Sequence, residues 1–169
     1  MDNDTWTVEQ GYRKATKWVD DLDIPWVDVQ TGDMRDDISF GNLAQADTQE
    51  IEEYLSRSGA WLAFTELNIA SLTSKKGAYE TALDMEMKVA KSQIAHDWVD
   101  LGYTKKPTID EIEGIILSSN ERVVEVMRTL TEITVAYDKL QGRREAFKGL
   151  FNTASRVLSA RSMEAARNG

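Results

Sequence analysis

The chain has 169 residues and a mass of 19.1 kDa, which is the length of one domain rather than two. It carries 29 acidic and 20 basic residues, and the resulting net charge of −9 excludes indiscriminate coating of nucleic acid or anionic membrane. The absence of cysteine excludes disulfide frameworks, thiolate metal sites and cysteine nucleophiles. The sequence shows no basic leader and no apolar run near the ~18 residues of a membrane span, so we expect a cytoplasmic protein without membrane contact.

We interpret residues 1–46 as an acidic N-terminal arm. Residues 1–58 carry 14 acids and 5 bases, a balance of −9, and the stretch around Pro25 reads as extended or loosely ordered. Residues 7–18 are compatible with a short helix. Trp18 and Trp26 either dock on a partner protein, such as a recombinase or a single-strand-binding protein, or fold back onto the core of the chain itself.

A first long helix is predicted over residues 48–101. Asp47 and Glu50 form a capping-box variant at its start, and apolar or small residues then recur at alternating steps of three and four. A second apolar row widens this stripe, so the helix is expected to meet more than one neighbour; the row comprises Tyr54, Trp61, Phe64 and Leu67. Gly102 is the expected stop signal.

A second long helix is predicted over residues 109–167. Thr108 and Glu111 form a capping box directly after Pro107, and the apolar repeat that follows is sustained over more heptads than coiled-coil packing requires. Gly142 and Gly149 are the expected places for a bend. Residues 139–169 carry 7 bases and 2 acids, so the acidic chain ends in a basic tail with a balance of +5.

Two helices of similar length joined by a short turn predict an all-α fold, a long antiparallel helical hairpin or coiled coil over residues 47–169. Such pairing brings Arg161 near Thr48 and Arg156 near Glu53, so part of the basic tail is expected to be neutralised internally. A hairpin this thin leaves apolar rows uncovered, and we therefore expect a homo-oligomer. The predicted core and oligomer positions are Leu62, Ile69, Leu72, Ile116, Val123, Val126, Leu130, Ile133, Tyr137, Leu140, Phe147, Phe151 and Leu158.

No constellation for catalysis, cofactor or metal binding is recognisable, and we expect a protein that is not an enzyme. The chain has one histidine, His96, without the glutamate that a di-iron bundle would place three residues earlier. The stretch from Glu50 to Glu53 resembles half of the magnesium site of all-α nucleotide pyrophosphohydrolases. The second half, a glutamate three residues before an aspartate on the next helix, is missing.

Cations with aromatic rings nearby suggest a surface for single-stranded DNA, in which lysines and arginines follow phosphates while bases stack on rings. The candidate residues are Lys75, Lys76, Tyr79, Lys139, Arg143, Arg144 and Lys148. The competing interpretation is a set of solubilising lysines and a tail of internal ion pairs. Arg144 and Arg161 occupy positions of the apolar repeat, where a charge needs a partner or a ligand.

The order of these features resembles phage recombination mediators of the UvsY type. The similar parts are Asp37-Ile-Ser-Phe-Gly-Asn-Leu43, the basic-aromatic step from Lys75 to Tyr79, and the arginine-bearing closing helix. The resemblance implies a helical ring in the host cytoplasm that binds single-stranded DNA and helps to load a recombinase. Lys75 and Lys76 would then contact DNA, and the closing helix would contribute to oligomerisation. Two alternatives stay open: a non-catalytic phage structural, assembly or adaptor protein, and an acidic DNA mimic such as an anti-CRISPR.

Overall fold

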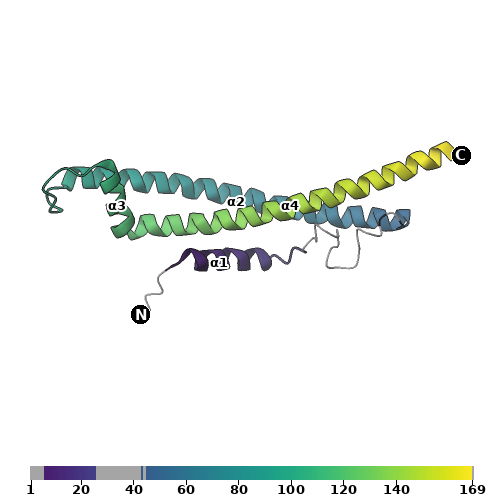
Figure 1. The fold of residues 1–169 in the computed structure, drawn as a ribbon, viewed down its shortest axis with the longest axis horizontal. Helices are drawn as coiled ribbons and strands as arrows, with labels where there is room; N and C mark the ends of the chain where they lie inside the picture. Colours follow the sequence, from purple (N-terminus) through teal and green to yellow (C-terminus); the bar gives the residue numbers. More distant parts are fainter. Residues whose placement is uncertain (1–5, 26–42, 44, 169) are drawn as a thin grey trace. The chain divides into compact units, whose positions relative to one another are not determined.

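The computed structural model describes residues 6–25, 43 and 45–168, and in this part of the chain all regular structure is helical (Figure 1). The helices are α1 (Val8–Asp20), α2 (Thr48–Asp97), α3 (Ile109–Ser119) and α4 (Glu121–Asn168). α1 lies where the arm was compatible with a short helix. Trp26 and the stretch Asp37–Asn42 fall outside the described residues. The predicted all-α fold is confirmed.

The chain divides into two compact units. The first unit combines Met1–Ala15 with Leu72–Val135, and the second combines Thr16–Ser71 with Ala136–Gly169. In each unit α2 runs antiparallel to α4 (Figure 1). The Arg122 guanidinium contacts the Glu86 carboxylate at 2.8 Å in the first unit, and Phe151 lies against Gly59 in the second. Both contacts fall within one residue of the register predicted for the hairpin.

The core of the first unit forms where α2 meets α3 and the start of α4. Its buried residues are Ala90, Ile112, Ile116 and Val123, with Leu83, Met87, Ile94 and Ala95 packed around them. The core of the second unit draws buried side chains from the end of α1, from α2 and from α4, and Val19 of α1 is among the fully buried ones. Its fully buried side chains include Ile51, Tyr54, Leu140 and Phe147.

Two small polar residues sit at seam positions of α2 in the second unit. Ser58 and Thr65 are fully buried, and each hydroxyl donates to a carbonyl one turn earlier in the same helix, Ser58 to Tyr54 at 2.8 Å and Thr65 to Trp61 at 2.7 Å. Because both hydroxyls already have a hydrogen-bond acceptor within α2, neither requires a polar partner on α4. The second unit can therefore bury these two small polar residues without leaving their hydroxyls unpaired.

Both predicted helix starts have the predicted caps. The Asp47 backbone N–H donates to Glu50 Oε2 at 2.7 Å, while the Glu50 backbone N–H donates to Asp47 Oδ1 at 2.8 Å. Thr108 and Glu111 form the same reciprocal pair at the start of α3. α2 ends at Asp97 rather than at residue 101, and Gly102 supplies the left-handed backbone that ends the turn, with a φ of 83°.

The capping box of α3 predicts a pH dependence. The hydrogen bond from the Thr108 backbone N–H, and then the bond to the Thr108 side chain, hold the pKa of Glu111 below its ordinary value of 4.5. A lowered pKa in the folded state means that the cap contributes its stability above pH 4.5 and loses it as the pH falls through the lowered value. An NMR titration of Glu111 should show this lowered pKa, and Thr108→Ala should return it only part of the way towards 4.5, because the variant keeps the backbone N–H and removes only the side-chain bond.

The prediction of one helix over residues 109–167 is wrong, because the chain breaks between α3 and α4. Asn120 has extended backbone with φ −93° and ψ 92°, and its Oδ1 accepts a hydrogen bond from the Val123 backbone N–H at 3.1 Å. The Ser118 and Ser119 hydroxyls both donate to the Ile115 carbonyl just before the break. Serine and asparagine side chains that bond to nearby backbone favour helix ends over helix interiors, and here they end one helix and cap the next.

The expected bends at Gly142 and Gly149 do not interrupt α4, which runs from Glu121 to Asn168. A Cβ built at either glycine meets no atom within 4 Å. Gly142→Ala and Gly149→Ala should therefore each stabilise the protein, by roughly 0.5–1 kcal/mol, because alanine is the better helix former. Urea denaturation should show this gain. Gly102→Ala is the control and should destabilise instead, because its positive φ disfavours a side chain.

Candidate binding surfaces

The predicted DNA-contacting residues fall in two groups that belong to different units. Lys75, Lys76 and Tyr79 lie on α2 in the first unit, where Lys75 is exposed and the other two are half-buried. The second group lies on α4 in the second unit, and it comprises exposed Lys148, half-buried Lys139 and Arg144, and buried Arg143. Within each group, helical spacing places the residues within two or three turns of one another.

The Arg143 side chain is buried in the second unit. Only 7% of its side chain is exposed, and its guanidinium donates to the Val19 carbonyl at 3.4 Å, the Ile24 carbonyl at 3.1 Å and Asp20 Oδ1 at 2.8 Å. Val19 and Asp20 lie at the C-terminal end of α1, where the helix dipole favours a cation, and Ile24 lies four residues beyond it. In this structure Arg143 therefore fastens α1 to α4, and it does not present an open cation to a phosphate.

Two further cations of the basic tail are also engaged within the second unit. Arg161 donates to the backbone carbonyls of Leu43, at 3.2 Å, and Ala46, just before α2. Arg144 pairs with Glu145, and this hydrogen bond holds the pKa of Glu145 below its usual value. Arg144 is thus paired with an acid of the tail itself, and Arg161 bonds to neutral backbone carbonyls that precede Thr48. The expected neutralisation of the tail by the acidic start of α2, with Arg156 near Glu53, stays a prediction.

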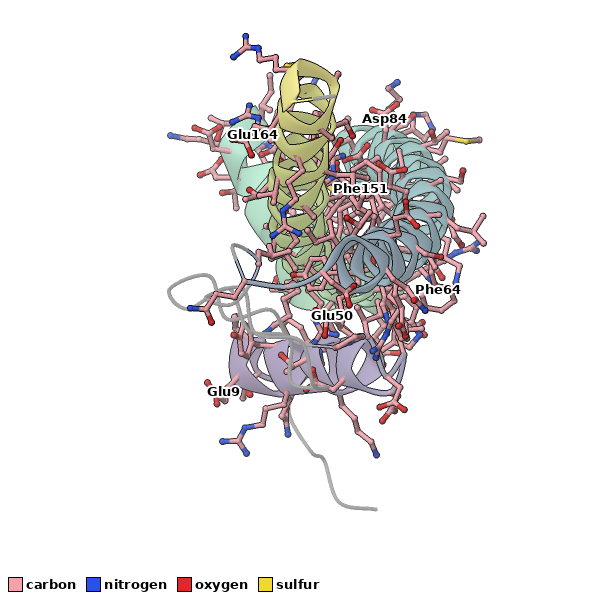
Figure 2. The ribbon with its side chains drawn as sticks, turned by 90° about the vertical axis from the view of Figure 1, so that its right-hand side faces the viewer. Glu9, Glu50, Phe64, Asp84, Phe151 and Glu164 are labelled. Carbon is pink, nitrogen blue, oxygen red and sulfur yellow. The ribbon has the colours of Figure 1, made fainter. Side chains whose placement is uncertain are left out.

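The predicted core residues lie inward with one exception. Buried residues are Ile69, Leu72, Ile116, Val123, Leu140 and Phe147, and half-buried ones are Leu62, Val126, Leu130, Ile133, Tyr137 and Leu158. Phe151 is 37% exposed although its ring touches Gly59. Figure 2 shows Phe151 between α4 and α2 in the second unit. The apolar repeat of α4 therefore identifies the side that packs on α2.

The residues of the second apolar row of α2 differ in how far they are buried. Tyr54 is fully buried, whereas Phe64 is 40% and Leu67 70% exposed. The Trp61 and Phe64 rings pack edge-to-face, with 5.9 Å between their centroids. Figure 2 shows Phe64 on the side of α2 away from α4. Large apolar side chains therefore remain at the surface of the second unit, together with Trp18, which is 38% exposed.

Trp6 has a role that the sequence analysis did not assign. In the first unit its indole N–H donates to Glu132 at 3.4 Å, and the Arg128 guanidinium lies 5.6 Å from the centre of its ring. Lys14 contacts the same Glu132 carboxylate at 2.7 Å. The sequence shows only that a tryptophan precedes a short helix. It does not indicate which residues of α4 contact the ring.

The described residues contain no group of three or more histidine, cysteine, aspartate or glutamate side chains able to hold a metal ion. His96 is exposed on α2, and Glu50 and Glu53 are exposed near its start. An open cavity of about 430 Å³ lies in the first unit beside the break between α3 and α4; its lining comprises Ala90, Gln93, Ile94, Ile116, Ser119, Asn120 and Glu121. Its lining contains one charged group and no recognisable set of reacting residues.

Among the described residues, no helix combines the length and apolarity needed to cross a bilayer. Comparison with known proteins gives no match to a family model, to a curated protein or to a solved structure.

Proposed function

We propose that this chain is a non-catalytic assembly or adaptor protein that acts as a homo-oligomer and binds protein partners. The observation that carries the proposal is the pair of large apolar side chains on α2, Phe64 and Leu67, which face solvent in the second unit. Exposed apolar groups of this size on a helix are typical of surfaces that another helix covers.

The state of the basic tail supports the same proposal. Arg143, Arg144 and Arg161 each bond within the second unit, so these three cations are less available to a polyanion than the charge of the tail suggests. This favours an assembly role over a role in which the tail mainly grips nucleic acid.

Light scattering of the purified full-length chain tests the proposal when combined with titration of a fluorescent single-stranded oligonucleotide at low salt. We expect a mass of at least two chains and no measurable DNA binding. A monomer at micromolar concentration would contradict the assembly role. An oligomer that binds the oligonucleotide would instead support the second candidate.

The second candidate is a phage recombination mediator that binds single-stranded DNA in the host cytoplasm and contacts a recombinase or single-strand-binding protein. What favours it, besides the resemblance to the UvsY type, is exposed Lys75 beside half-buried Tyr79, and exposed Lys148 on α4. Log affinity should then fall with log salt at a slope of about −0.7 per phosphate neutralised. Lys75→Ala should flatten that slope, whereas Lys105→Ala, at an exposed lysine beyond α2, should leave it unchanged.

A further inference from the structure

The turn that joins α2 to α3 carries several exposed apolar side chains. We call residues 98–106 the tip; it belongs to the first unit and follows the end of α2 (Figure 1). Val99, Leu101 and Tyr103 of the tip are all exposed. Large apolar groups that lie this close together at a surface are typical of a region that another molecule covers.

Hydrogen bonds hold the backbone of the tip in a defined conformation. The Gly102 backbone N–H donates to the Val99 carbonyl at 3.0 Å, and the Tyr103 backbone N–H donates to the Trp98 carbonyl at 3.1 Å. Together with the positive φ of Gly102, these two bonds form a Schellman motif. The tip therefore presents its apolar side chains on an ordered backbone, and a molecule that covers them does not have to order the turn first.

The cavity beside the break between α3 and α4 belongs to the same unit and offers a surface of matching chemistry. Its apolar lining consists of Ala90, Ile94 and Ile116, and its one charged lining residue is the exposed Glu121. Its volume of about 430 Å³ lies within the ~300–1,000 Å³ typical of sites that enclose drug-sized ligands, so it has room for side chains of a turn. The cavity thus combines an apolar lining with a single negative charge.

The charge of the tip after Gly102 is opposite to that of the cavity. Lys105 and Lys106 follow Gly102 and are both exposed, whereas the acids nearest the tip, Asp97 and Asp100, precede Gly102. The segment from Tyr103 to Lys106 therefore combines an exposed aromatic ring with two cations and no acid. This is the complement of a cavity that has an apolar lining and one carboxylate.

None of the tip residues lines the cavity of its own chain. A second copy brings both surfaces at once, and a two-fold pair in which each tip enters the cavity of the other copy forms every contact twice. We propose that two copies of this chain pair through their first units in this way, with Lys105 and Lys106 of one copy beside Glu121 of the other. The proposal rests on the homo-oligomer proposed above and adds a contact separate from the one expected at Phe64 and Leu67.

Charge reversal in the full-length chain tests the contact with Glu121. Glu121→Lys replaces attraction with repulsion at both ends of the pair and should weaken self-association about tenfold in sedimentation, with an unchanged helical circular dichroism signal. The double variant Lys105→Glu with Lys106→Glu should have a similar effect. Combining all three substitutions restores opposite charges and should recover the wild-type affinity. An affinity that stays reduced in the combined variant would overturn the contact.

Because the chain has no cysteine, disulfide cross-linking between copies tests the pairing directly. Thr104→Cys places a thiol in the tip and Gln93→Cys places one in the cavity lining, and both positions are exposed. The two single variants, one of them carrying a size tag, are mixed and oxidised with diamide, and a disulfide-linked heterodimer should be the main product.

The matched control mixes Thr104→Cys with Met85→Cys, since Met85 is exposed on α2 in the same unit but does not line the cavity. This mixture should give little heterodimer. Equal yields in the two mixtures, or an oligomeric wild type whose variants do not cross-link, would overturn the pairing alone. A wild-type monomer would overturn both the pairing and the assembly role.

Discussion

Replacing Phe147 with alanine is expected to lower the free energy of unfolding by about 4 kcal/mol. Phe147 is fully buried in the second unit, and removing its ring forfeits apolar burial and leaves a cavity, a combination that costs ~3–5 kcal/mol for phenylalanine. Urea denaturation followed by circular dichroism measures the loss.

Phe151→Ala is the matched control, since it removes the same ring one helical turn further along α4. Phe151 is 37% exposed, so its replacement forfeits less buried surface and should cost about 1–2 kcal/mol. Equal losses in the two variants would contradict the placement of the core of the second unit around Phe147.

Replacing Arg143 with alanine is expected to cost about 3 kcal/mol and to loosen the end of α1. The variant removes the charged donor that the Val19 and Ile24 carbonyls share with the Asp20 carboxylate, and buried carbonyls that lose a charged partner are costly. The Val19 carbonyl keeps its bond from the Leu22 backbone N–H at 3.3 Å, and the Asp20 side chain is 52% exposed, so its carboxylate can bond to water instead. Arg143→Lys should recover only part of the loss, because one ammonium group reaches fewer acceptors than a planar guanidinium. Denaturation measures the free energy, and hydrogen exchange at residues 17–20 reports on α1.

Arg144→Ala removes the neighbouring cation and serves as the control. Arg144 pairs with Glu145, whose side chain is 58% exposed, and ion pairs this exposed contribute little to stability. Unchanged hydrogen exchange at the end of α1 in Arg143→Ala would show that Arg143 does not fasten this helix.

Local signals in the sequence predicted the local parts of the fold. Each capping box lies within four consecutive residues, Thr108 with Glu111 and Asp47 with Glu50, so the sequence shows both partners. Gly102 favours a positive φ without any contact to a distant residue. The apolar repeat continues across Asn120 and therefore predicts an unbroken helix there. The serines and the asparagine favour a helix end at this point, but the repeat is the longer signal. The decisive contacts there are hydrogen bonds to the helix's own backbone, which hydrophobic periodicity does not report.

The candidate site was harder to predict, because its residues depend on contacts between distant parts of the chain. Arg143 reads as an open cation in a basic tail, and its three acceptors lie more than a hundred residues away. Phe64 and Tyr54 belong to one apolar row in the sequence, yet one is exposed and the other buried. Sequence spacing gives the face of a helix, whereas the packing of α4 on α2 decides which part of that face is covered.

The contact between Phe151 and Gly59 bears on the register of α4 against α2 in the second unit. A Cβ at position 59 would lie 3.4 Å from the Phe151 ring, so the ring rests where α2 has no side chain. A shift by one heptad in either direction would place the ring over Glu52 or Glu66. Within the second unit this contact therefore favours the observed register of α4 on α2 over a register shifted by a heptad.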